Sequence, residues 1–287
     1  MAEIDQFESV FKSADKTPFT HEPIDVRSAL VVTDLPSEDS ERFAAQVRSF
    51  LHVLEEEAQP LRWQIISGDQ YARVADLLEL VEQSKPDLIC TYRNLHIPAT
   101  EYPYSLGVYL DVLTQVSAAP VLALPHPRRQ LQRPDVMQGT RTVMAITNHL
   151  TGDHHLVSYA TRFTEPEGTL LLSHVEDEST YQRYINTIAK IPEIDTEIAR
   201  RNILEQLLKE PEDYIDSCRL VLRQQGLPIR VEQIVTLGHH LSDYHRLVQE
   251  HQVNLLVLNT KDEDQLAMHG LAYPLSVELR EIPLLLL

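Results

Sequence analysis

Ser28-Ala-Leu-Val-Val-Thr-Asp34 is a short apolar run that ends on an acid, and Thr142-Val-Met-Ala-Ile-Thr-Asn148 repeats it with an amide at the end. Helix-forming residues follow each run, to about Glu57 and about Phe163. Continuous apolar runs of this length, bounded by polar residues that can cap helices, are typical of buried parallel strands that lead into helices. The two stretches therefore predict the first strand and first helix of two similar units.

The later signals of both units follow in the same order. A strand that ends at a glycine turn, a helix and a further strand are predicted at 63–91 and again at 231–259. Gly107 then opens a helix 13 residues before Pro120, and Gly270 stands 13 residues before Pro283. We therefore divide the chain into a polar extension (1–26), a first unit (27–126), a linker (127–140) and a second unit (141–287).

The two units differ in length. The second carries an additional strand at 168–175 and a long helical stretch at 179–225, which Pro192 and Pro211 are expected to break into pieces. The first unit runs directly from its first helix to the strand that begins near Trp63. The first unit is therefore predicted to be the shorter one.

Composition excludes several classes of protein. Lys and Arg total 25 against 43 Asp and Glu, a net charge of −18, which argues against nucleic acid or an anionic membrane surface as the main partner. The 8 glycines are scattered, so no phosphate loop built from clustered glycines is present. The 2 cysteines stand alone, which excludes a four-cysteine zinc site and argues against a disulfide framework. With no secretory signal or membrane span readable, we expect a cytoplasmic protein without membrane insertion.

The segment Val31-Val-Thr-Asp34-Leu-Pro-Ser-Glu-Asp-Ser-Glu-Arg, the glycine turns at Gly68 and Gly238 and the closing glycine–helix–proline–apolar strand resemble the universal stress protein (UspA) family. The resemblance covers about 27–126 and 141–287, and it implies a tandem member with two doubly wound parallel α/β sheets, the first truncated. Members of the family commonly pair through their last strands. The resemblance therefore implies that 121–124 and 283–287 meet within one chain as a pseudo-dimer.

The resemblance also implies where a nucleotide would bind. Many members hold ATP with an Asp at the end of the first strand and a G-x2-G-x9-G-[S/T] loop after the fourth, where backbone N–H groups surround the phosphates. Asp34 and Asn148 stand at the first position, and Gly107 and Gly270 match the last glycine. The other loop positions have lost their glycine or hydroxyl in both units; they are Asn94, Ile97 and Val108, then Val257, Thr260 and Leu271. The site is thus expected to be degraded, and Asp34 has the simpler alternative of capping the helix that begins near Ser37.

Histidines gather at the predicted carboxyl edge of the second unit, where ligands bind in doubly wound sheets. Imidazole suits divalent transition metals and titrates near neutral pH, so a metal site is one hypothesis and ordinary loop polarity is the other. The candidate ligands are His149, His174, His239 and His240.

No nucleophile elbow and no cysteine-nucleophile signature is present, so we predict that the chain is not an enzyme. The leading hypothesis is a universal-stress-type regulatory or binding protein of the cytoplasm without a cofactor, which acts through protein partners or a small ligand. One alternative is an ATP-binding member with weak or no hydrolysis. Another is a metal- or pH-sensing protein that uses the histidine-rich edge. A homodimer is left open.

Overall fold

The computed structural model describes residues 18–56, 59–97, 104–127, 137–147, 150–260 and 271–287. Asn148, His149 and Gly270, three of the predicted site residues, lie outside these ranges. Most of the linker at 127–140 also lies outside them.

In the first unit strands alternate with helices, as the apolar runs and caps predict. The elements are β1 (Ser28–Val32), α2 (Ser37–Phe50), the short 3-10 helix η1 (His52–Leu54), β2 (Arg62–Ile66), α3 (Val74–Ser84), β3 (Leu88–Tyr92), α4 (Val108–Val116) and β4 (Val121–Leu124). Strands β1, β3 and β4 are buried along their whole length, while β2 exposes every second residue at its start. This difference follows from the position of β2 at the edge of the sheet.

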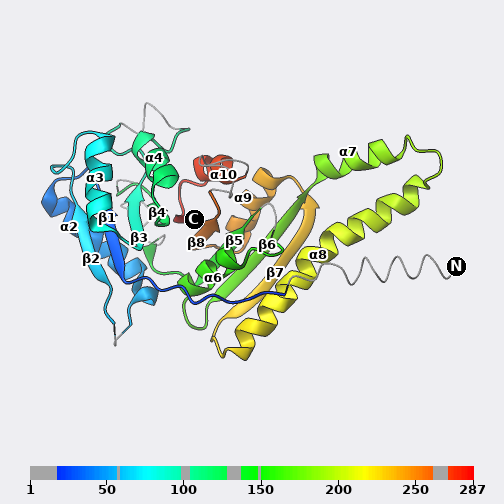
Figure 1. Cartoon of the computed structure of the whole chain (residues 1–287), viewed down its shortest axis with the longest axis horizontal. Helices are drawn as coiled ribbons and strands as arrows, with labels where there is room; N and C mark the ends of the chain where they lie inside the picture. The colour runs from blue at the N-terminus through cyan, green and yellow to red at the C-terminus, as the bar shows by residue number, and fades with distance from the viewer. Residues whose placement is uncertain (1–17, 57–58, 98–103, 128–136, 148–149, 261–270) are drawn as a thin grey trace.

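The second unit contains the additional strand and the long helical segment. Its elements are β5 (Thr142–Ile146), α6 (His154–Phe163), β6 (Thr169–Asp177), α7 (Glu178–Ile188), α8 (Thr196–Gln224), β7 (Arg230–Gly238), α9 (His240–Glu250), β8 (Leu255–Leu258), α10 (Ala272–Glu278) and β9 (Leu284–Leu286). Helices α7 and α8 form an arm that projects from the body of the protein (Figure 1).

One of the two predicted helix breaks is wrong. Pro192 lies between α7 and α8, as expected, but Pro211 lies inside the 29-residue helix α8 and is buried. A proline inside a helix removes one backbone hydrogen bond. The residues that follow it in α8 bury Tyr214, Ile215 and Cys218, and this burial offsets the lost bond.

Within the described residues the strands form one nine-stranded sheet in the order β2-β1-β3-β4-β9-β8-β5-β6-β7. Every neighbouring pair is parallel except β4 and β9. On the outer side of β5 lie β6 and β7, whereas β1 has only β2 on that side, so within the described residues the first unit has one strand fewer than the second, as predicted. The protein is therefore an α/β protein with two doubly wound halves in a continuous sheet (Figure 1).

The two halves meet where β4 pairs antiparallel with β9. Val121 lies opposite Leu286, Leu122 opposite Leu285 and Ala123 opposite Leu284. All six side chains are buried, and they belong to a single hydrophobic core that extends through both units. An apolar edge strand of either unit is thereby covered by the other.

A segment before β1, residues 18–27, runs in extended conformation over the second unit before the chain enters the first (Figure 1). We call it the N-terminal strap. Its Phe19 is buried, with its ring edge-on to that of Tyr214 at 6.2 Å between centroids. The N–H of Phe19 donates to Ser217 Oγ (3.0 Å) and that of Glu22 to Ser158 Oγ (3.1 Å). Part of the polar extension predicted at 1–26 is thus packed against α6 and α8.

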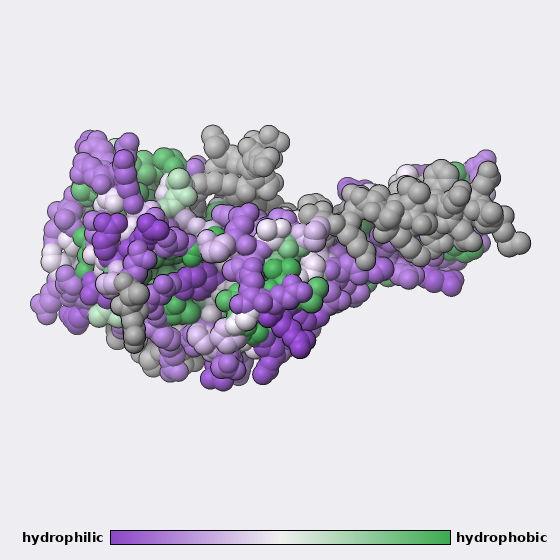
Figure 2. Space-filling view, turned by 60° about the horizontal axis from the view of Figure 1, so that its bottom comes forward, coloured by the Kyte–Doolittle hydropathy of each residue, from purple (hydrophilic) through white to green (hydrophobic). Residues whose placement is uncertain are grey.

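The described surface is mostly hydrophilic on the face shown in Figure 2, with hydrophobic residues in separate groups. Among the described helices, none combines the length and the apolar composition that a membrane span requires.

Candidate functional site

Asp34 follows β1 at the carboxyl edge of the first unit, and both of its carboxylate oxygens accept hydrogen bonds from within the chain. The Tyr92 hydroxyl donates to Oδ1, and the backbone N–H of His96 donates to Oδ2 over 2.9 Å. The N–H of Asp34 in turn donates to the Tyr92 hydroxyl (3.2 Å). Asp34 thus joins the end of β1 to the end of β3 and to the turn that follows it.

The alternative that Asp34 caps the next helix is wrong. Helix α2 begins after Pro36, and no side chain caps its N-terminus. The carboxylate of Asp34 is held by Tyr92 and His96 and points toward β3 instead.

Three aromatic rings pack against one another next to the segment that contains Asp34. The rings of Tyr71 and His96 lie 4.8 Å apart between centroids, and Tyr109 lies 5.3 Å from His96. The Tyr71 hydroxyl donates to the carbonyl of Thr33 (3.0 Å). Burial raises the pKa of Tyr71 and of Tyr92, so both phenols stay protonated and act as donors at neutral pH.

Gly107, the match to the last loop glycine, begins α4 with a φ of +87°, a conformation that glycine adopts at little cost. A Cβ at this position would lie 2.9 Å from the Cα of Asn94. Asn94 itself has a φ of +60°, a left-handed conformation that asparagine tolerates better than most residues. Its N–H donates to the carbonyl of Leu106 (2.9 Å), so this backbone donor is already in use.

Gly68 brings the turn after β2 against Asp34. A Cβ at Gly68 would lie 2.5 Å from the carbonyl oxygen of Asp34, so no side chain fits there without movement of the backbone. The N–H of Gly68 donates to the carbonyl of Leu35 (2.8 Å). The glycine turn predicted from the sequence therefore lies in close contact with the backbone of Asp34.

At the carboxyl edge of the second unit, Asp153 connects the described segments through hydrogen bonds. Its carboxylate accepts from the N–H of Leu156 (3.0 Å), which caps α6, and from the side-chain amide of Asn259 beyond β8. Burial raises the pKa of Asp153 above its ordinary value. Asp153 therefore links the first helix to the fourth strand of this unit.

The described candidate histidines lie on two neighbouring elements but have separate partners. His174 on β6 is buried, its Nε2 lies 3.2 Å from Glu176 Oε2, and its Nδ1 has no partner within the described residues. His240 Nε2 is 2.7 Å from the carbonyl oxygen of Val175. His239 is exposed and lies 3.7 Å from Glu178.

The carboxylates near these histidines cap helices. Asp177 accepts from the N–H of Thr180 (2.7 Å), and hydrogen bonds from the side chain and then the backbone of Thr180 lower the pKa of Asp177. Asp243 is bound by Arg246, which lowers its pKa, and by the N–H of His239. Over the part of the chain that the structure describes, no three His, Cys, Asp or Glu side chains come together as a metal-holding group. The fourth candidate, His149, is not among those residues.

The tyrosines around Asp34 are the residues that sequence reasoning missed. Tyr92 is the last residue of β3, and the parallel register places the ends of β1 and β3 side by side. The hydroxyl-bearing residues Thr91 and Tyr92 at the end of β3 were the available signal. Tyr71 and Tyr109 carried no comparable pattern.

The described elements form an α/β fold with a mostly parallel sheet, and solved structures have a similar fold. A comparison with family models and with curated proteins finds no match to this sequence. The chain is similar to a functionally unknown protein from Pseudomonas aeruginosa PAO1, over 91% of this chain and 92% of that one (TM-score 0.51, 14% identity). A candidate universal stress protein from Pseudomonas aeruginosa UCBPP-PA14 is similar over 91% and 93% of the two chains (TM-score 0.51, 13% identity). A universal stress protein from Archaeoglobus fulgidus is similar over 90% and 95% (TM-score 0.50, 12% identity). Because these structures cover nearly the whole chain, the likeness shows that both units together have this fold.

Proposed function

We propose that the protein is a non-enzymatic regulatory or binding module of the universal stress type, located in the cytoplasm, which acts through protein partners or a small ligand and does not hold ATP in its first unit. The observation that supports this proposal is the state of Asp34. Its two oxygens already accept from Tyr92 and from the backbone of His96. A nucleotide would have to displace these donors before it could use the carboxylate.

The surroundings of Asp34 support the same conclusion. The rings of Tyr71, His96 and Tyr109 pack against one another beside it. At the position of the phosphate loop, the N–H of Asn94 donates to Leu106, so it does not point freely toward a phosphate. A phosphate site depends on several free backbone donors at one helix N-terminus.

The experiment is a thermal melt of the full chain with and without millimolar ATP and Mg²⁺. A ligand at 100 times its dissociation constant stabilises a protein by about 2.7 kcal/mol, so genuine binding gives a shift of several degrees. We expect no appreciable shift. A shift that Asp34→Ala abolishes would contradict the proposal, and mass spectrometry of gently purified protein would then identify the nucleotide.

The two alternatives have separate tests. An ATP-binding protein with weak hydrolysis would show the thermal shift and slow release of phosphate. A metal- or pH-sensing protein would bind Zn²⁺ or Ni²⁺ through His149, His174, His239 or His240. The engagement of His240 by Val175 and of Asp177 and Asp243 by helix ends makes this second alternative the weaker one.

A further inference from the structure

Helices α7 and α8 project from the body of the protein as an arm, and the apolar side chains of α8 are only partly covered there (Figure 1). Every buried residue of α8 lies at Pro211 or beyond, so the stretch 196–210 contains none. Helix α7 covers part of this stretch, where the Tyr181 hydroxyl donates to the carbonyl of Arg200 (2.8 Å). Several apolar side chains of the stretch remain half-buried; they are Ala199, Ile203, Leu204, Leu207 and Leu208. Because a helix with an apolar stripe packs that stripe against another element, the arm has room for one more.

One side of α8 runs from the arm to the residues that hold the N-terminal strap. Five residues recur on it at intervals of four, three, four and three positions; they are Ile203, Leu207, Glu210, Tyr214 and Ser217. The strap occupies the far end of this side, where the N–H of Phe19 donates to Ser217 Oγ (3.0 Å) and its ring packs on Tyr214. The side that the strap covers therefore continues into the arm, where Ile203 and Leu207 are still partly exposed.

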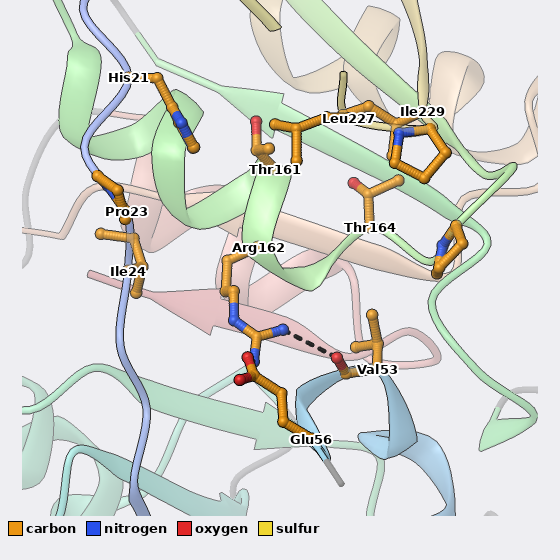
Figure 3. A pocket seen from close by; sticks show the side chains of 12 residues that line it. His21, Pro23, Ile24, Val53, Glu56, Thr161, Arg162, Thr164, Leu227 and Ile229 are labelled. Atoms are coloured by element: carbon orange, nitrogen blue, oxygen red, sulfur yellow. Dashed lines mark hydrogen bonds and ion pairs between the residues drawn. The ribbon is translucent and has the colours of Figure 1, made fainter. Parts of the chain in front are cut away.

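The direction of the strap shows on which side the preceding chain joins it. Two residues after Phe19, His21 Nδ1 lies 2.5 Å from Oε1 of Gln225, beyond the C-terminal end of α8. His21 and Ile24 then line a cleft together with Arg162 of α6 (Figure 3). From Ser217 the strap thus runs toward the C-terminal end of α8 and away from the arm. Residues 1–17, which lie outside the part of the chain that the structure describes, join it at the end that faces the arm.

The sequence of this preceding segment has the pattern of an amphipathic helix. Ile4, Phe7 and Phe11 follow one another at intervals of three and four positions, and Lys12 and Lys16 come next. A helix of two or three turns is not stable alone in water, so such a helix forms only where a surface buries its apolar side.

The segment is long enough to reach the arm. Ile203 and Ser217 are 14 positions apart (217 − 203), which is about 21 Å along a helix. The residues 12–18 span up to about 23 Å when they are extended. Phe11 therefore reaches Ile203 while Phe19 stays at Tyr214 and Ser217.

We propose that residues 4–11 bind as a helix along the side of α8 that contains Ile203 and Leu207, with Phe7 and Phe11 packed on these two side chains. Lys12 and Lys16 then lie on the stretch that passes the exposed Glu210, so that opposite charges meet. A second copy of the chain is the less suitable occupant, because each copy carries a net charge of −18 and the two repel each other.

The test is hydrogen–deuterium exchange of the full chain, followed by mass spectrometry of peptides that cover 4–11 and 199–210. The double variant Phe7→Asp, Phe11→Asp should speed exchange in 199–210 at least about tenfold, a factor that the burial of one phenylalanine exceeds. Leu207→Asp should speed exchange in 4–11 by a similar factor. Because each variant is read in the segment that it leaves unaltered, local damage around the substituted residue does not produce the result by itself.

Two variants are matched controls, since they add the same charge on other sides of the two helices. Ser9→Asp lies opposite the apolar side of the first segment, and Ile198→Asp replaces a residue of α8 that is 54% exposed and off the shared side. Both should leave exchange in the other segment unchanged. Exchange in 199–210 that the Phe7, Phe11 variant does not alter would overturn the proposal, as would controls that act as strongly. Protection that disappears on dilution would overturn it in favour of a second copy.

Discussion

Leu122 and Leu285 lie opposite each other in the antiparallel pairing of β4 with β9, 163 positions apart in sequence (285 − 122) and both fully buried. Through this pair and its neighbours the fourth strand of one unit and the last strand of the other complete a single sheet. The stability of each unit is therefore tied to the presence of the other.

Removal of Leu284 to Leu287 should uncover the apolar edge of β4 and cause aggregation or unfolding, because unpaired apolar edge strands associate with other chains. Size-exclusion chromatography and thermal melts measure this. Leu285→Ala should cost about 2–5 kcal/mol, the range for buried leucine, whereas Leu220→Ala on the exposed face of α8 serves as the control. A truncated chain that remains monomeric and equally stable would show that the pairing is dispensable.

Tyr92→Phe should lower the free energy of unfolding by about 1.5–3 kcal/mol, because it removes a hydrogen bond to the carboxylate of Asp34. Tyr109→Phe is the control, since its hydroxyl donates to the neutral carbonyl of Ala72 and should cost about 1 kcal/mol. Urea unfolding of the two variants compares these costs. Equal stability of Tyr92→Phe and the unaltered protein would mean that the bond to Asp34 contributes nothing.

Phe19→Ala should release the N-terminal strap from α6 and α8, because the buried ring of Phe19 packs against His154 and Tyr214. We expect faster cleavage within residues 18–27 by a nonspecific protease, with a smaller change in the main unfolding transition. Thr20→Ala, at an exposed position of the same strap, should leave cleavage unchanged. Identical cleavage of both variants would argue that the strap is held by its backbone hydrogen bonds alone.

Asp153→Asn should reduce the pH dependence of stability. Burial raises the pKa of Asp153 from its ordinary value of 3.8, so the folded protein binds a proton more tightly there than the unfolded chain does. The stability that this group contributes is fully present below pH 3.8 and is lost as pH rises through the folded pKa. The variant can still cap α6 with its amide oxygen, and melts from pH 4 upward should show a smaller decline than the unaltered protein. A steeper decline would refute the assignment.

Zinc titration addresses the histidine edge. We expect no binding tighter than about 100 μM at pH 7.5, a dissociation constant that corresponds to about 5.5 kcal/mol, because His240 and the nearby carboxylates already have partners. Tighter binding that the double variant His174→Ala, His240→Ala removes, and that weakens at pH 5.5, would restore the metal hypothesis, since ligands must be neutral to coordinate.

The sequence predicted the strands and most helices of this fold because its apolar runs are continuous and its caps are polar. It also predicted that both units have the same order of elements, because the repeat places Gly107 and Gly270 at equal distances from Pro120 and Pro283. The predicted helix break at Pro211 is wrong because the backbone restriction that proline imposes is only one contribution to the stability of α8. The burial of Tyr214 and Ile215 one turn further on depends on tertiary packing that no local pattern reveals.

The candidate site was predicted only in part. The position of Asp34 at the end of β1 follows from the apolar run that precedes it. Its contact with Tyr92 depends on the neighbouring positions of β1 and β3, and the two residues are 58 positions apart in sequence. Phe19 and Tyr214 are still further apart in sequence, and their packing was not predicted, since a short stretch with one aromatic residue carries no periodic signal.

Because β4 and β9 belong to one chain, their antiparallel pairing does not depend on the protein concentration. Two separate subunits that paired through such strands would dissociate as their concentration fell. Here each unit always has the other at the effective concentration that the connecting chain sets. A substitution in one half is not copied into the other, as it would be in a symmetric pair. The two halves do differ: among the described residues the first contributes four strands to the sheet, and the second contributes five strands and the projecting helical arm.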